Sequence, residues 1–237
     1  MLAHADPVVA WARAAHAVAL EVVKTPGDMR CGGTWRVGVD EVPNAPDGAI
    51  SGVPLTGPWE GLVPLPRQWH YAQLSVVYPG YPKQDKGESD AAHRFRLRRD
   101  AAHVDGLLPE GPDKRRHLRE PHRFILGLPL NTATASPLVV WEGSHQIMRQ
   151  TFAAAYDGIE PADWGDVDVT DIYQAARRSV FDKCVRTQIH VAPGQAVVLH
   201  RHLVHGVAPW GDGSAPPEGR IIAYFRPQFE TVADWLG

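Results

Sequence analysis

The chain has little cysteine, no long apolar run and no large excess of charge of either sign. Its 237 residues include only Cys31 and Cys184, too few for a disulfide framework, so we expect a reducing, cytoplasmic location. The N-terminal residues contain no basic segment followed by a continuous apolar stretch, which argues against a signal peptide or a membrane span. A formal net charge of −3 creates no global field for nucleic acid or membrane surfaces. We therefore expect a soluble protein without such partners; the sequence does not indicate its oligomeric state.

Proline and glycine, by contrast, are abundant, with 21 and 22 residues, which is typical of many short strands joined by turns. Residues 7–24 have apolar positions at helical spacing, and 31–67 have no clear period, so we expect 1–69 to be helical and looped cover. The rest, 70–230, is expected to form the core of a single 1–237 domain. We predict strands at 73–78, 93–99, 124–130, 138–141, 186–191, 196–199 and 220–227, with 186–199 as a hairpin; polar loops at 83–90 and 110–119; and helices at 145–156 and 171–184. This order predicts a mainly β fold: a double-stranded β-helix (jelly-roll, cupin-like) core with flanking α-helices.

His103-Val104-Asp105 is the first candidate for chemistry. A His and an Asp two residues apart on a strand point to the same face, so one distant His would complete a set of two imidazoles and one carboxylate. That set leaves half of an octahedron open and is typical of non-heme Fe(II) oxygenases. The segment 199–206 offers three further histidines, His200, His202 and His205. A surface turn with incidental polar residues is the alternative interpretation of the motif.

Arg220 is the second candidate. It lies fifteen residues beyond His205, at the start of an apolar strand. A buried arginine needs an anionic partner, and its planar fork binds a carboxylate through two hydrogen bonds. An internal ion pair is the alternative to a bound ligand.

Together these segments resemble the phytanoyl-CoA dioxygenase-like branch of the Fe(II)/2-oxoglutarate dioxygenases over residues 70–228. The resemblance is carried by His103-Val-Asp105, by Gly143-Ser-His145 after a core strand, by Pro193-Gly194 leading to His205-Gly206, and by Arg220. Two positions depart from the family pattern: Glu142 replaces a proline, and Val207 stands where serine is common.

The resemblance implies that His103, Asp105 and His205 bind Fe(II) and that Arg220 binds the C5 carboxylate of 2-oxoglutarate. It further implies that O2 is the co-oxidant and that oxidation of a small-molecule substrate releases succinate and CO2. Related halogenases lack the carboxylate ligand, so Asp105 favours hydroxylation or another oxidative outcome. The alternatives are a metal-binding jelly roll with other chemistry, such as a cupin-type dioxygenase or isomerase, and a non-enzymatic ligand sensor.

Several residues compete for these roles. Strand alternation places His200 and His202 on one face and His205 on the other unless the strand bends, yet the His-Gly ending and the spacing to Arg220 favour His205. We therefore interpret the others as follows: His200 near the metal ligands or in the core, His202 outward or lining the pocket, Glu120 and His122 on a solvated loop or pocket rim, Arg226 in structural pairing or substrate contact, and His145 packing at a helix start.

The substrate is indicated only by a dense basic region between Arg94 and Arg123 and by aromatic residues around Trp69 and Tyr81. The basic region is compatible with an acidic substrate or with a solvated face interleaved with acids, and the aromatic residues with a cavity mouth or with core packing. Known members of the resembled branch act on acyl-CoA thioesters, amino acids and alkaloid-like molecules. The sequence does not select among them.

Overall fold

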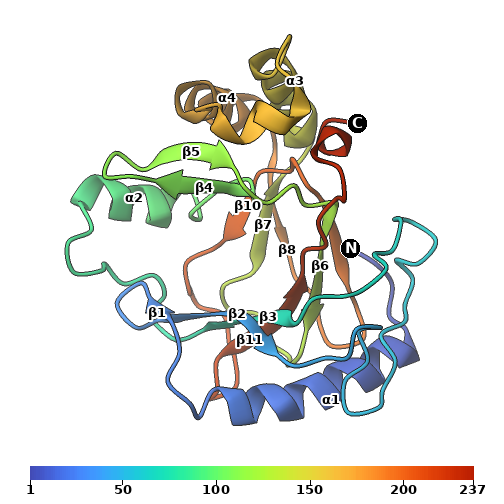
Figure 1. Ribbon diagram of the computed structural model, residues 1–237. Helices are drawn as coiled ribbons and strands as arrows, with labels where there is room; N and C mark the ends of the chain where they lie inside the picture. The colour runs from blue at the N-terminus through green and yellow to red at the C-terminus, as the bar shows by residue number, and fades with distance from the viewer.

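A computed structural model describes residues 1–237 and shows a mainly β architecture with helices at its two ends (Figure 1). The helices are α1 (Asp6–Val22), α2 (Asp90–Arg98), α3 (Ser144–Ala155) and α4 (Thr170–Lys183), with short 3-10 helices η1 (Pro161–Asp166) and η2 (Val232–Trp235). The strands are β1 (Met29–Arg30), β2 (Trp35–Val42), β3 (Ala72–Val77), β4 (Leu107–Glu110), β5 (Arg115–Leu118), β6 (Phe124–Pro129), β7 (Leu138–Trp141), β8 (Arg186–Ile189), β9 (Val197–His200), β10 (His205–Val207) and β11 (Arg220–Phe225).

The strands form two main antiparallel sheets and a hairpin. The larger sheet has the order β1-β2-β3-β11-β6-β9, the smaller has the order β10-β7-β8, and β4 pairs with β5. From β6 to β11 the chain passes back and forth between the two sheets, with β6, β9 and β11 in the larger and β7, β8 and β10 in the smaller. An isolated antiparallel bridge between His103 and His205 adds the segment at His103 to the smaller sheet, next to β10. This is the double-stranded β-helix, so the predicted fold class is confirmed.

Alternation of side chains along the strands builds three apolar layers. On β7, Leu138 and Val140 face the space between the sheets, and Val139 and Trp141 face α3 and α4. On β11, Ile222 and Tyr224 face inward, whereas Ile221, Ala223 and Phe225 belong to the layer under α1. Both faces of these strands are covered, which explains why they read as continuous apolar runs.

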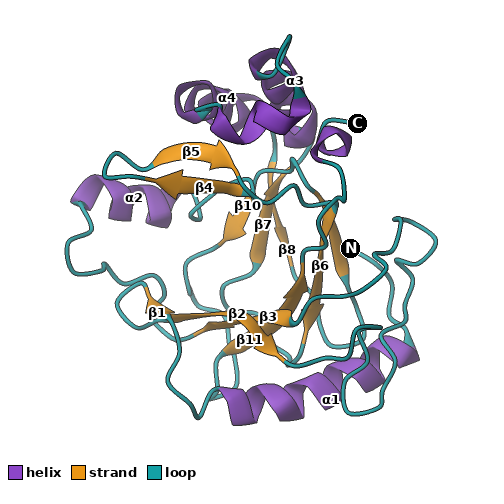
Figure 2. Ribbon diagram, in the orientation of Figure 1, coloured by secondary structure: helices purple, strands orange, loops and turns teal.

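The helices cover the outer faces of the sheets (Figure 2). Helix α1 buries Val8, Trp11, Ala15 and Ala19 in the layer on the outer face of the larger sheet. The Trp11 indole donates to the Gly48 carbonyl at 2.9 Å, which satisfies its polar atom inside the core. Helices α3 and α4 pack on each other and on the outer face of β7.

Three predicted segments differ in the structure. Residues 35–42, expected as extended or looped cover over the core, form β2, which belongs to the larger sheet itself through pairing with β3. Residues 93–99, expected as a strand, belong to α2, because the Ser89 hydroxyl caps the helix by accepting from the Ala92 N–H. The 110–119 loop is largely a hairpin, β4 with β5.

One further expectation needs correction, and another is confirmed in part. Strands β8 and β9 do not form a hairpin, since β8 pairs with β7 and β9 pairs with β6 in opposite sheets. Of the pair Gly143-Ser144, expected to supply the N-cap of the helix at 145–156, Gly143 at φ 78° is the cap, and the Ser144 hydroxyl accepts from the Val204 N–H at 2.9 Å without capping the helix. The serine thus joins α3 to the segment that leads into β10.

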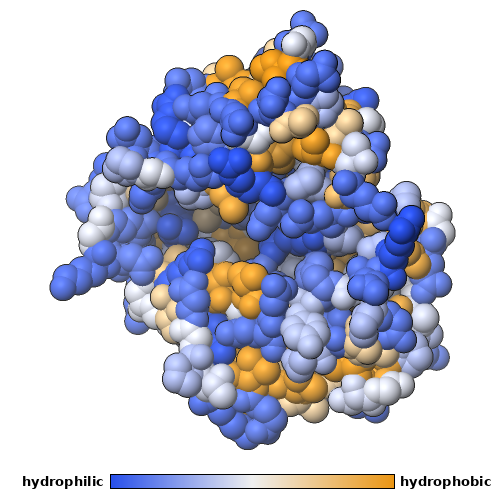
Figure 3. Space-filling model, viewed as in Figure 1, coloured by the Kyte–Doolittle hydropathy of each residue, from blue (hydrophilic) through white to orange (hydrophobic).

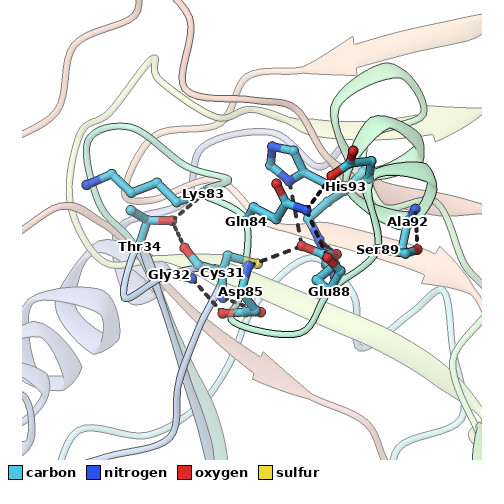
Figure 4. A network of polar contacts seen from close by, with 12 residues as sticks. Cys31, Gly32, Thr34, Lys83, Gln84, Asp85, Glu88, Ser89, Ala92 and His93 are labelled. Carbon is cyan, nitrogen blue, oxygen red and sulfur yellow. Dashed lines mark hydrogen bonds and ion pairs between the residues drawn. The ribbon is translucent and has the colours of Figure 1, made fainter.

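The 83–90 loop is fastened to the β1–β2 turn (Figure 4). The Asp85 carboxylate accepts from the backbone N–H groups of Gly32 and Cys31 at 2.6 and 3.0 Å. These bonds, the one from Gly32 first, lower the pKa of Asp85. The loop is therefore held against the β1–β2 turn where it leads into α2.

None of the helices is long and apolar enough to cross a lipid bilayer.

Candidate metal centre

Sheet register places His205 inside the β-helix. His205 lies opposite Val140 in the β10–β7 pair, and residues directly opposite each other share a face. Val140 is part of the inner layer, so His205 also points inward, and its side chain is 8% exposed. The chain leaves β9 at His200, turns through residues 201–204 and enters the other sheet. Because of this bend, strand alternation does not relate the face of His205 to the faces of His200 and His202.

His103 is joined to His205 by a reciprocal backbone bridge. The His103 N–H donates to the His205 carbonyl at 2.9 Å, and the His205 N–H donates to the His103 carbonyl at 3.0 Å. The two rings are 4.7 Å apart between centroids. Asp105 follows in the turn after the bridge, with Oδ1 3.0 Å from His103 Nε2 and 3.8 Å from His205 Nε2. One ligand atom from each residue lies within 4.8 Å of the others.

Both imidazoles are oriented by backbone carbonyls. Nδ1 of His103 lies 2.9 Å from the Ala101 carbonyl, and Nδ1 of His205 lies 2.9 Å from the Leu203 carbonyl. A carbonyl only accepts, so each Nδ1 donates to its carbonyl, and each Nε2 is left on the side of the ring that faces Asp105, where it can bind a metal ion. Carbonyl partners of this kind fix the ring orientation of metal-binding histidines.

Charge at the cluster is balanced by Arg226. Its Nε lies 2.6 Å from Asp105 Oδ2, although the contact lacks the angle of a hydrogen bond. Burial acts to raise the pKa of the Asp105 carboxyl, but Arg226 and the two histidines hold it well below its usual range. Burial lowers the pKa of His205 to about 4, against the opposing pull of Asp105. At neutral pH the cluster therefore presents a carboxylate and a neutral imidazole, the protonation states that a metal ion requires.

Gly206 lets two segments approach closely behind the cluster. A Cβ at this position would lie 2.1 Å from the Asp100 carbonyl, which accepts from the Val207 N–H at 2.9 Å. The Asp100 side chain is 2% exposed and is held by Arg186 through two hydrogen bonds of 2.7 Å. The glycine in the His-Gly pair is thus needed to bring His103 against His205.

Arg220 lies on the same inward face as Arg226, because residues 220, 222, 224 and 226 alternate with the outward ones along β11 and its extension. It is 5% exposed, forms no ion pair, and its Nη1 is buried without a hydrogen-bond partner. A small pocket around it is lined by Leu138, Val197, Ile222 and Tyr224, among others. Unpaired buried donors cost free energy, so an anion bound at this guanidinium would be stabilising.

The cluster opens into a cavity of about 1110 Å³. Figure 3 shows this hollowed face, with hydrophilic residues around much of the opening. His103, Asp105, His205 and Arg226 line the cavity, which shares Leu138 and Tyr224 with the Arg220 pocket. The volume lies slightly above the range of typical small-molecule sites, roughly 300–1,000 Å³.

The competing histidines lie elsewhere. His202 is 0% exposed and packs edge-on against Trp235 at 4.4 Å, so the expectation that it faces outward or lines the pocket was wrong. His200 is half-buried between His202 and His145, with ring distances of 5.2 and 5.0 Å, and His145 is at the start of α3 as predicted. None of the three lines the cavity.

Glu120 and His122 line the cavity, but His122 is not solvated. It is 4% exposed, and its Nε2 lies 3.2 Å from Glu120 Oε2. Trp69 packs in the core against Phe225 instead of forming a cavity mouth. Tyr81 does line the cavity.

Sequence reasoning missed the residues that hold Arg226. Gln73 Oε1 accepts from its guanidinium, and His70 Nε2 accepts from its backbone N–H at 2.7 Å. Gln73 is paired with Tyr224 in register, so a polar residue on a buried strand was the signal that could have identified it.

Comparisons with known proteins leave the family open. No protein-family model and no curated protein sequence matches the chain. Among solved structures, it is similar to one described as "non-heme iron oxygenase OrfP in complex with Fe and alpha-ketoglutaric acid", with 14% identity and a TM-score of 0.29. The match covers 49% of this chain and 52% of that chain, about half of each. At this level the likeness does not establish an activity, so the proposal below depends on the chain's own residues.

Proposed function

We propose that this protein is a non-heme Fe(II)/2-oxoglutarate-dependent oxygenase that hydroxylates a small molecule and releases succinate and CO2. The observation that carries the proposal is the pairing of the His103–Asp105–His205 cluster with an unpaired buried Arg220 on the inner face of one β-helix. Membership of the phytanoyl-CoA dioxygenase-like branch is part of the same proposal. It is supported by the order and spacing of these residues along the chain.

The donor set fits a divalent iron ion. His103 Nε2, His205 Nε2 and Asp105 Oδ1 would hold it, and no thiolate is near to favour a softer metal. Three protein ligands leave further positions for other ligands on the cavity side. When bound, the iron would supply the redox chemistry that couples O2 and 2-oxoglutarate to substrate oxidation.

Arg220 would bind the distal carboxylate of 2-oxoglutarate. Its buried Nη1 has no partner in the protein, and a carboxylate would supply two acceptors in the plane of the guanidinium. Tyr224 and Leu138 line both its pocket and the cavity, and the pocket itself has no space for a water molecule. A short dicarboxylate that reaches from Arg220 toward the cluster would therefore require these two side chains to move apart.

The test is anaerobic addition of Fe(II) and 2-oxoglutarate to the protein, followed by visible absorption. We expect a weak charge-transfer band that appears only when both are present. Arg220→Ala should bind the metal but require far more 2-oxoglutarate for the same band. Absence of the band in the wild type, or an unchanged titration in Arg220→Ala, would exclude the proposed cosubstrate site and favour a metal-binding jelly roll with other chemistry.

A further inference from the structure

The cavity carries more positive than negative charge, and part of the positive charge is not neutralised. Seven arginines line it: Arg30, Arg67, Arg96, Arg116, Arg123, Arg177 and Arg226. Four of them form ion pairs: Arg30 with Asp28, Arg67 with Glu230, Arg96 with Glu88, and Arg226 with Asp105. The other three, Arg116, Arg123 and Arg177, have no carboxylate within ion-pair distance.

Arg116 and Arg177 line the same cavity, and the elements that carry them, β5 and α4, are in contact. Arg116 on β5 donates to the Leu107 carbonyl at 2.8 Å, and Arg177 on α4 donates to the Ala102 carbonyl at 3.1 Å. Both are half-buried. Burial lowers the pKa of Arg116, and the neighbouring charge of Arg177 acts in the same direction. Each guanidinium has five N–H donors, so most of them are without a protein partner.

Aromatic rings hold the Arg177 guanidinium in place. Its Cζ lies 4.6 Å from the Phe95 ring centroid and 5.1 Å from that of Tyr173. The Tyr173 hydroxyl accepts from the Val104 N–H at 3.2 Å, between the two ligands of the His-x-Asp motif. The acceptor of Arg177, Ala102, directly precedes His103. The pair of arginines is therefore tied to the backbone that carries the candidate metal ligands.

Two adjacent, partly desolvated cations without a counter-charge are unfavourable in the free protein, and a bound anion would relieve both the repulsion and the unused donors. The two arginines nearest to Arg116 in the sequence are neutralised: Arg115 pairs with Asp168 and Asp171, and Arg119 pairs with Glu110. Arg116 thus differs from its neighbours in facing the cavity without an acid.

We propose that Arg116 and Arg177 form an anion subsite that binds a carboxylate or phosphate ester group of the substrate. The proposal extends the oxygenase function argued above and names its substrate class: an organic anion with an apolar body. The rest of the cavity suits that body, since Trp35, Val37, Phe95 and Leu108 also line it. Because the subsite adjoins His103 and Asp105, oxidation is expected in the part of the substrate nearest its acidic group.

The test measures binding of three matched probes to the metal-free protein by saturation-transfer NMR: octanoate, octyl phosphate and neutral octanamide. We expect at least one of the two anions to bind and octanamide not to bind measurably. The Arg116→Gln/Arg177→Gln double variant should lose roughly tenfold or more in affinity per arginine, as hydrogen bonds to charged groups imply. The anion that binds with the higher affinity indicates whether the acidic group of the substrate is a carboxylate or a phosphate ester.

Two variants serve as controls. Arg115→Gln removes the neighbouring, outward-facing arginine and should leave anion binding unchanged. Arg220→Gln should also retain it, which separates this subsite from the proposed 2-oxoglutarate site. Should the double variant fail to fold, Arg116→Lys/Arg177→Lys keeps the charge without the planar fork and should still weaken binding.

The proposal would be overturned by equal binding of octanamide, by no binding of either anion to the wild type, or by loss of binding in Arg220→Gln alone. The metal-free readout is independent of oxygenase activity. Anion binding without an Fe(II)/2-oxoglutarate band would reject the proposed function and support the subsite. The band without anion binding would support the proposed function and reject the subsite.

Discussion

Arg226 engages one oxygen of Asp105 and leaves the other to the histidines. Its Nε lies 2.6 Å from Oδ2, whereas Oδ1 is 3.0 Å from His103 Nε2. The carboxylate is thereby turned so that a single oxygen faces the space between the imidazoles. Arg226 itself is held by Gln73 and His70, so this orientation is fixed before any metal binds.

Arg226→Gln should therefore weaken metal binding. A carboxylate released from its partner loses its fixed orientation, and loss of such partners typically costs about 10–100-fold in metal affinity. We expect at least roughly tenfold weaker Mn(II) binding by calorimetry, with Arg226→Lys intermediate because it keeps the charge but not the fork. Mn(II) affinity equal to or above that of the wild type would show that Arg226 does not position Asp105.

Asp105→Ala should abolish both Fe(II) binding and succinate formation, because it removes the only carboxylate of the cluster. The matched variant is Glu120→Gln, the other cavity acid two residues from a histidine, which pairs with His122. We expect Glu120→Gln to retain metal binding. Retained succinate formation in Asp105→Ala, together with loss of metal binding in Glu120→Gln, would show that Glu120 supplies the carboxylate ligand instead of Asp105.

Two buried arginines should respond oppositely to replacement by methionine. Arg36 is 3% exposed and is satisfied by Glu41 and by the Thr25 carbonyl, so Arg36→Met leaves the partly buried Glu41 carboxylate and that carbonyl without their partner and should cost about 1–3 kcal/mol of unfolding free energy. Arg220 has an unpaired Nη1, so Arg220→Met should leave the ligand-free protein unchanged or about 1 kcal/mol more stable. Urea unfolding of the metal-free protein measures both. Strong destabilisation by Arg220→Met would mean that Arg220 is structural.

His202 should make the protein sensitive to acid. Burial, with help from Arg201 and His200, lowers its pKa to about 2, whereas an unfolded chain binds the proton near its ordinary value. Stability from this residue is thus full above pH about 6.5 and is lost as pH falls, by about 1.4 kcal/mol per pH unit. His202→Leu should flatten the loss of stability between pH 6.5 and 4. An unchanged slope would contradict the buried neutral state.

Gly206→Ala should separate the two halves of the cluster. Its Cβ would meet the Asp100 carbonyl at 2.1 Å, a backbone atom that cannot rotate away. We expect a cost of about 1–3 kcal/mol in unfolding free energy together with weaker metal binding. Gly61→Ala is the control, because a Cβ there meets no atom within 4 Å. If both variants behave alike, close approach at Gly206 is not required.

Local patterns in the sequence predicted those elements that bury one continuous face or both faces. Helix α1 and strands β3, β6, β7 and β11 were predicted from apolar spacing because each packs a continuous face or both faces. Elements with polar surfaces were missed: α2 has no buried residue, and β4 and β5 each bury only one residue, Leu107 and Leu118. Where no face is buried, periodicity carries little information, and capping by Ser89 or cross-strand pairing decides the structure.

The sequence by itself determined the chemistry on offer: the His-x-Asp pair, a His-Gly after a turn, and an arginine at the start of an apolar strand. Only the tertiary structure decided which histidine joins the pair, because the chain crosses from one sheet to the other between His200 and His205 and so changes the face that each residue presents. It likewise decided that Arg226 contacts Asp105, and that Arg116 and Arg177 line one cavity without an ion-pair partner. These relationships depend on strand register and sheet closure, which join residues far apart in the chain and leave no local periodic signal.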